Sequence, residues 1–188
     1  AKGLDFPNVT LVGVLNADTA LNLPDFRSSE RTFQLLTQVA GRAGRAEKAG
    51  QVLIQSYNPQ HYAIRFAKDQ DYEGFYAYEM GIRRQLGYPP YYFTIGITLS
   101  HKKEEEVLRR AYQVMGILRS GLSDASIILG PTPKPIARTH NLYHYQILIK
   151  YRIEDELGPT LNQVLALTQE RENSELRLSI DHEPQQFL

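Results

Sequence analysis

One short stretch, Gly87-Tyr88-Pro89-Pro90, divides the sequence into two segments with different patterns of strands and helices. Two consecutive prolines continue neither a helix nor a central strand, so regular structure has to stop there. The chain has 188 residues, and a domain holds roughly 150, so the length allows one fair-sized domain or two small ones. The Gly-Tyr-Pro-Pro stretch therefore separates two segments of the chain.

The first part of the segment before the two prolines, residues 1–58, predicts an α/β unit with parallel strands. Residues 9–15 form an apolar run rich in β-branched side chains, which is typical of a strand buried on both faces of a parallel sheet. A helix is expected from an N-cap at Ser28 to Gly41, followed by a second buried strand over 51–55. Two strands bury too little apolar surface to be stable alone, so residues 1–58 should need partner strands from upstream sequence.

The remaining residues predict a helical connector, 59–90, and a second domain, 91–188. The connector has an aromatic face among its charged residues. A Pro-rich turn is expected at 130–135. The elements expected in the second domain are strands at 92–99, 126–129, 142–151 and 176–180, and helices at 104–119 and from Pro159 onward. The order βαββαβ is that of a ferredoxin-like fold, in which both helices cover one face of the sheet.

Composition excludes several classes of protein. Lys plus Arg and Asp plus Glu each number 21, so no overall field favours nucleic acid, and any argument from charge must be local. The absence of Cys excludes disulfides and Cys-ligated metal sites within these residues. No apolar run approaches the roughly 18 residues of a membrane span, so no membrane partner is expected. The first residue is Ala1 rather than Met, and the residues after it do not form a basic-then-apolar leader, so we expect the chain to begin inside a longer protein.

Residues 38–45, Gln-Val-Ala-Gly-Arg-Ala-Gly-Arg, form the most specific motif. Gln38, Arg42 and Arg45 recur at helical spacing on one side, and the two glycines remove side chains that would block a close approach. Two guanidinium groups that face the same way favour a phosphate, and in phosphoryl transfer they neutralise charge on the γ-phosphate. A glycine-capped helix end with solvated arginines is the alternative.

These eight residues match motif VI, Gln-x-x-Gly-Arg-x-Gly-Arg, of superfamily 2 helicases, and residues 2–7 match their motif V. Over essentially its whole length the chain resembles the bacterial primosomal replication-restart helicases, including Tyr88-Pro-Pro90, Gly130-Pro131 and the Asp-His-Glu-Pro of 181–184. The resemblance implies an α/β plus α+β chain: the latter part of a RecA-like helicase lobe 2, then a ferredoxin-like C-terminal domain.

The resemblance also implies a function: an ATP-dependent 3′-to-5′ DNA helicase that recognises stalled replication forks and initiates primosome assembly in the bacterial cytoplasm. In such helicases the residues matching Gly3 and Asp5 border the ATP site, those matching Arg42 and Arg45 reach the γ-phosphate, and the one matching Gln38 transmits the nucleotide state. The family uses ATP with Mg²⁺ and holds zinc through Cys residues that this chain lacks. The phosphate-binding loop is also missing from these residues, so the chain alone should have no ATPase activity.

A second set of residues suggests contact with nucleic acid. Residues 131–152 contain no acid and combine basic with aromatic side chains, a composition typical of nucleic-acid binding. Strand alternation directs Tyr143 and Tyr145 toward the helices, as core residues rather than stacking platforms, and His144 and Lys150 toward the open face. The candidate DNA contacts are Lys134, Arg138, His140, His144 and Lys150. A solvated hairpin is the alternative.

The partners implied by the resemblance are forked and single-stranded DNA, single-strand-binding protein and other primosome proteins. Residues 153–188 hold eight acids and two bases, so this part should repel DNA. No His residues cluster with acids at metal-ligand spacing, and no metal site is expected. A non-catalytic nucleic-acid-binding or protein-interaction module is the competing function. An RNA-directed helicase would share the arginines without explaining Tyr88-Pro-Pro90 or the ferredoxin-like part.

Overall fold

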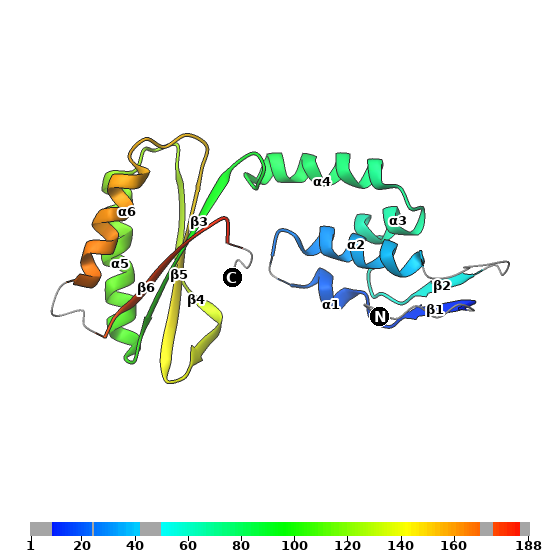
Figure 1. The fold of residues 1–188 in the computed structure, drawn as a ribbon, viewed down its shortest axis with the longest axis horizontal. Coiled ribbons are helices and arrows are strands. Elements are labelled where there is room, and N and C mark those ends of the chain that lie inside the picture. Colours follow the sequence, from blue (N-terminus) through cyan, green and yellow to red (C-terminus); the bar gives the residue numbers. More distant parts are fainter. Residues whose placement is uncertain (1–8, 24, 42–49, 170–174, 185–188) are drawn as a thin grey trace. The chain divides into compact units, whose positions relative to one another are not determined.

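The computed structural model describes residues 9–23, 25–41, 50–169 and 175–184. The chain divides into two compact units, Ala1–Ile82 and Arg83–Leu188, and each is described by itself (Figure 1). No described helix is long and apolar enough to cross a membrane. The expected domain limits at residues 58 and 90 stay predictions.

The N-terminal unit contains the predicted strand, helix and strand. Its elements are β1 (Leu11–Val14), α1 (Asp18–Leu21), α2 (Ser28–Ala40), β2 (Gln51–Ile54), α3 (Tyr62–Lys68) and most of α4 (Tyr72–Leu86). The two strands pair in parallel, with Leu11 opposite Gln51 and Val14 opposite Ile54. Ser28 is the first residue of its helix rather than the predicted cap, because Arg27 takes the N-cap position.

A small aromatic core joins the helices of this unit to one face of its sheet. Phe33 of α2 stacks on Phe75 of α4 with ring centroids 4.1 Å apart, and Val14 and Ile54 pack against the cluster to which both rings belong. On the other face Leu11 and Leu53 are 57% and 55% exposed. In this chain the core cluster therefore covers only one face of the two strands. Burial of the other face by partner strands from upstream sequence stays a prediction.

The C-terminal unit has the βαββαβ order predicted from the sequence. After the end of α4 its elements are β3 (Phe93–His101), α5 (Glu104–Gly121), β4 (Ile127–Thr139), β5 (Leu142–Tyr151), α6 (Leu157–Ala166), the 3₁₀ turn η1 (Leu167–Gln169) and β6 (Arg177–His182). The strands form one sheet in the order β4-β5-β3-β6, and every neighbouring pair is antiparallel. Both helices lie on the same side of this sheet (Figure 1), which leaves the opposite face open.

Side-chain periodicity explains the core of this unit. The stripe of α5 that includes Val107, Val114 and Leu118 is fully buried, and so are alternate residues of the strands, such as Ile97 and Ile149. Tyr143 and Tyr145 are partly buried and pack against the same cluster. The prediction that these tyrosines face the helices is confirmed.

The Pro-rich segment differs from the prediction. Residues 130–135 are not a turn but belong to β4, which runs for 13 residues. Its register with β5 shifts between Leu129 and Thr132 and again between Pro133 and Arg138. Proline has no N–H to donate, so such a segment stays in a sheet only as an edge strand with irregular pairing. The chain turns instead at His140 and Asn141, whose φ angles are 49° and 60°, as a two-residue hairpin requires.

One carboxylate makes the stability of this unit depend on pH. Glu154 Oε2 accepts hydrogen bonds from the Ser123 Oγ at 2.7 Å, the Ser123 N at 3.0 Å and the Ser126 Oγ at 2.5 Å. The Ser123 and Ser126 hydroxyls lower the pKa of Glu154 below its ordinary 4.5. A carboxyl whose pKa is lowered by folding stabilises the fold above its unfolded pKa, and this contribution disappears as the pH falls through the folded pKa.

We therefore expect Glu154→Gln to reduce the free energy of unfolding at neutral pH and to make its decline in acid less steep. Urea unfolding followed by circular dichroism between about pH 7 and pH 3 measures both quantities. Asp155→Asn, at an exposed neighbouring position, is the matched control and should behave like the wild type. An unchanged pH dependence in Glu154→Gln would contradict this account.

Candidate nucleic-acid interface

The β4–β5 hairpin carries three of the five predicted DNA contacts at or near an exposed tip. Arg138 is exposed, its guanidinium lies 4.9 Å from the centroid of the Tyr143 ring, and its Nη2 donates to Asn141 Oδ1 at 3.3 Å. His140 is exposed in the turn, and Lys134 is half-buried. The tyrosine ring and the Asn141 amide orient Arg138, but neither neutralises its charge, which remains available to a phosphate.

The fourth predicted contact, His144, has both ring nitrogens engaged within the sheet. Ser100 Oγ lies 2.7 Å from Nδ1, and Thr139 Oγ1 lies 2.7 Å from Nε2. The ring is half-buried and joins β3 to the end of β4. His144 therefore supports the hairpin rather than presenting a free donor to DNA.

The structure corrects the prediction for the fifth residue, Lys150. Strand alternation places it on the open face, as predicted, but it is only 5% exposed. Its Nζ donates to the Leu86 carbonyl oxygen at 3.3 Å. Sequence alternation cannot show that a distant segment covers part of the face, and Lys150 is no longer a candidate DNA contact.

Three basic residues that the sequence analysis missed lie at the same end of the sheet as the hairpin. The strand register pairs His101 with Tyr143 and Ser100 with Arg177, so the end of β3 and the starts of β5 and β6 meet at one edge. Lys102 and Lys103, in the turn after β3, are exposed, as is Arg177. These residues are remote in sequence, and only the pairing of the strands brings them together.

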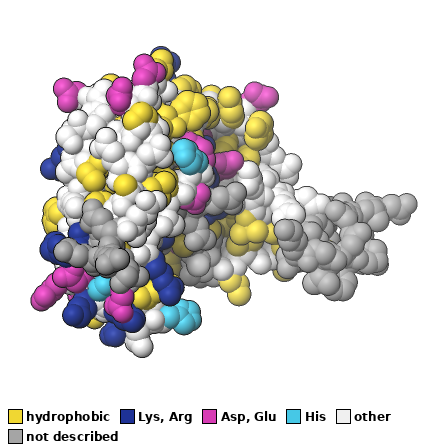
Figure 2. Space-filling view, turned by 60° about the vertical axis from the view of Figure 1, so that its left-hand side comes forward, with side chains coloured by type: hydrophobic (Ala, Val, Ile, Leu, Met, Phe, Trp, Pro, Cys, Tyr) yellow, Lys and Arg dark blue, Asp and Glu magenta, His cyan; other side chains and the backbone are white. Residues whose placement is uncertain are grey.

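We call Lys102, Lys103, Lys134, Arg138, His140 and Arg177 the basic end of the sheet. Its charge is partly offset by Glu175, whose carboxylate lies 2.9 Å from Lys102 Nζ, and this lysine lowers the pKa of Glu175. Figure 2 shows Lys, Arg and His side chains, with some acids among them, along the lower edge of the C-terminal unit. Such a surface favours contact with a phosphate backbone. Tyr143 and Tyr145 are partly buried and pack against the core, so their rings are not free to stack on bases.

Most residues of the predicted ATP motifs lie outside the part of the chain that the structure describes. Gln38 lies in the last turn of α2 and is exposed. Gly3, Asp5, Arg42 and Arg45 lie outside the described residues. The predicted roles of all five residues stay predictions.

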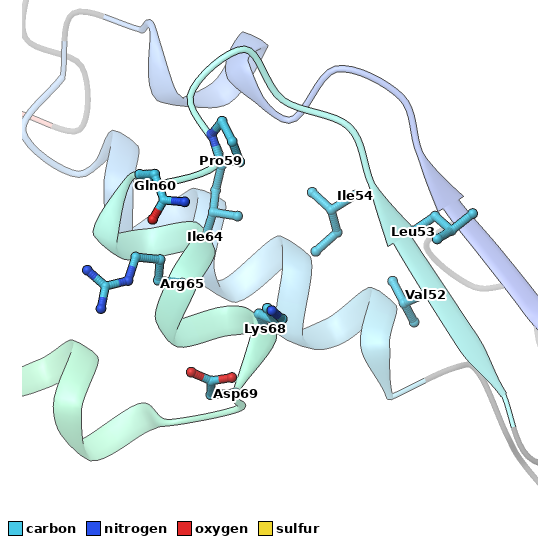
Figure 3. Close-up of a pocket in the computed structure, with 9 residues that line it drawn as sticks. All are labelled: Val52, Leu53, Ile54, Pro59, Gln60, Ile64, Arg65, Lys68 and Asp69. Atoms are coloured by element: carbon cyan, nitrogen blue, oxygen red, sulfur yellow. The ribbon is translucent and has the colours of Figure 1, made fainter.

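A pocket of 430 Å³ lies between β2 and α3 in the N-terminal unit. Figure 3 shows Val52 and Ile54 pointing toward α3, while Arg65 points away from the strand. The polar side chains that line this pocket include Arg65, Lys68 and Asp69. They do not converge on one point, as the groups of a catalytic site do. No group of His, Asp or Glu residues in the described part of the chain has the arrangement of a metal site.

Comparison with known proteins identifies the family. The family model of the primosomal protein N C-terminal domain matches residues 84–185. The replication restart protein PriA of Bacillus subtilis is 49% identical over 189 residues, which cover 100% of this chain and 24% of that protein. The PriA proteins of Synechocystis sp. and Rickettsia conorii are 46% and 38% identical, and the alignments cover 80% and 99% of this chain and 18% and 28% of those proteins. The chain thus spans about a quarter of the length of these relatives. It belongs to the family of the replication restart protein PriA and includes the C-terminal domain of that family.

Proposed function

We propose that this chain is the C-terminal part of an ATP-dependent 3′-to-5′ DNA helicase that acts at stalled forks and initiates primosome assembly. The observation that carries the proposal is the 49% identity to a replication restart protein over the whole chain. Because the chain spans only 24% of that relative, unwinding is proposed for the whole protein.

In this proposal the N-terminal unit completes an ATP site. Its parallel strands and the helix that ends at the Gln38 motif are compatible with part of a RecA-like lobe 2. Arg42 and Arg45 would neutralise charge on the γ-phosphate, Gln38 would respond to the nucleotide, and Gly3 and Asp5 would border the site. The phosphate-binding loop, the ligands of Mg²⁺ and the zinc-binding Cys residues would come from the remainder of the protein.

The C-terminal unit would hold DNA through the basic end of the sheet. Basic side chains at the same end of β3, β4 and β6 can contact a phosphate backbone without reading bases. Forked or single-stranded DNA would be the ligand, and single-strand-binding protein and other primosome proteins would bind elsewhere on the whole protein.

Steady-state ATP hydrolysis tests this function. The full-length protein should hydrolyse ATP faster when forked DNA is added and should unwind the fork, whereas the 188-residue chain should show no hydrolysis above background, with or without DNA. Turnover proportional to the concentration of this chain would contradict the assignment of the phosphate-binding loop to the remainder of the protein. A full-length protein without DNA-stimulated turnover would contradict the helicase itself.

A non-catalytic binding module is the second candidate, and one observation favours it for the isolated chain. The C-terminal unit has a continuous core of buried residues from its sheet and both helices. Binding of DNA by this chain together with a full-length protein that lacks ATPase activity would establish the module in place of the helicase.

A further inference from the structure

Lys150 is a buried lysine that pairs with no acid among the described residues. It lies on β5 opposite Thr94 of β3, on the face away from the helices, and is 5% exposed. None of the ion pairs among the described residues includes it, and burial lowers its pKa. A buried ammonium group is costly unless other groups stabilise it, so its remaining contacts should explain its position.

Those contacts lie at the end of α4. Lys150 Nζ donates to the carbonyl oxygen of Leu86, the last residue of the helix, and lies 3.7 Å from the centroid of the Tyr88 ring. The final carbonyls of a helix have no partner within it, and the helix dipole favours a cation there. The ammonium group therefore caps the helix and also makes a cation–π contact with the residue that follows the helix end.

The backbone conformation after α4 places both groups that contact this lysine. Gly87 has a φ of +63°, and Tyr88 N donates to the Arg83 carbonyl at 2.9 Å, which is the left-handed glycine ending typical of helices. Arg83 Nη1 donates to the Pro89 carbonyl at 3.4 Å. The helix end thus places the Leu86 carbonyl and the Tyr88 ring on Lys150 together.

Glu183, an acid at this end of the sheet, is hydrogen-bonded to Thr94 rather than paired with Lys150. Glu183 Oε1 accepts from Thr94 N at 2.7 Å, and Glu183 N donates to the Thr94 carbonyl at 2.9 Å. Thr94 is 1% exposed. The Thr94 and Lys150 end of the open face is therefore covered, whereas the basic end, beyond Ser100 and His144, is accessible.

We propose that Lys150 is a positioning residue that latches the end of α4 and the Tyr88–Pro90 segment onto the open face of the C-terminal sheet, which confines DNA contact to the basic end. The second part rests on the proposed function. The latch is local, because Lys150 lies on the face opposite the hydrophobic core, and its loss should release this segment without unfolding the sheet.

Hydrogen–deuterium exchange of the full-length protein tests the latch. Lys150→Met keeps the length of the side chain but removes the ammonium group, and amides in residues 83–92 should exchange about tenfold faster or more, because a charged hydrogen bond is lost. Lys150→Arg should restore protection, since guanidinium also donates to carbonyls and stacks on aromatic rings. Exchange in α5 and β3 should stay unchanged. The control is Lys68→Met, at an exposed position of α3 outside the proposed DNA interface.

Unchanged exchange of residues 83–92 in Lys150→Met would overturn the latch, and so would equal loss of protection in the Met and Arg variants. If Lys150→Met fails to fold, Tyr88→Leu serves the same test, because it removes the ring but keeps the helix end. Its residues 83–92 should also exchange faster, and wild-type rates would overturn the latch.

A second arm adds forked DNA at low salt to the wild-type protein. Protection gained at residues 138–144 but not at 86–92 supports confinement to the basic end, and protection gained at 86–92 overturns it. If no segment of the C-terminal unit gains protection, the proposed DNA interface fails, whereas the latch is still judged by the variants.

Discussion

Replacing both Arg42 and Arg45 by alanine in the full-length protein should abolish measurable ATP turnover. The resemblance of residues 38–45 to helicase motif VI predicts that both arginines reach the γ-phosphate. An arginine in that role contributes about 10³ to 10⁵ in rate. Affinity for forked DNA should change little, because the proposed DNA contacts are in the C-terminal unit. Steady-state hydrolysis and fluorescence anisotropy with labelled DNA measure the two quantities on the same preparation.

The matched control is Arg65→Ala with Arg119→Ala, which also removes two arginines. Both side chains are exposed in the structure, and neither belongs to the motif. This variant should hydrolyse ATP at the wild-type rate. Turnover retained by the Arg42 and Arg45 variant would overturn their assignment to the ATP site.

Replacing Ile97 by alanine should destabilise the C-terminal unit by about 2 to 5 kcal/mol, through lost burial and the cavity left behind. Ile97 is fully buried at the centre of β3, with Ile147 on one side and Ile180 on the other. Urea unfolding followed by circular dichroism gives the change in the free energy of unfolding.

Ile136→Ala removes the same atoms from β4, where the side chain is 68% exposed. It should change the free energy of unfolding by no more than about 0.5 kcal/mol, as is usual for surface sites. Equal losses in the two variants would contradict the assignment of the core to the helix-covered face.

Periodicity made part of this fold predictable. The alternation along 142–151 correctly assigned Tyr143 and Tyr145 to the helix side, because a strand places successive side chains on opposite faces. The apolar stripe of α5 was equally clear, since Val107, Val114 and Leu118 recur at helical spacing and are all buried. Such local patterns depend only on the conformation of one element.

Features that depend on contacts between remote segments were not predictable in this way. The irregular pairing of β4 keeps the Pro-rich residues 130–135 in the sheet, although prolines usually indicate a turn. Strand register brings Lys102 and Arg177 to the hairpin end, and the end of α4 covers Lys150. A sequence pattern assigns a residue to a face but does not show which other segment covers that face.

The most direct test of the central claim, that the basic end of the C-terminal sheet holds DNA, is a salt series of binding to labelled forked DNA. The 188-residue chain is compared with a variant that combines Lys103→Ala, Arg138→Ala and Arg177→Ala. The control combines Arg84→Ala, Arg119→Ala and Arg152→Ala, which are also exposed. Each lost phosphate contact should reduce the slope of log affinity against log salt by about 0.7 to 0.9. The account expects weaker binding and a flatter slope in the first variant only. Wild-type affinity and slope in that variant, or no binding by the chain at low salt, would contradict it.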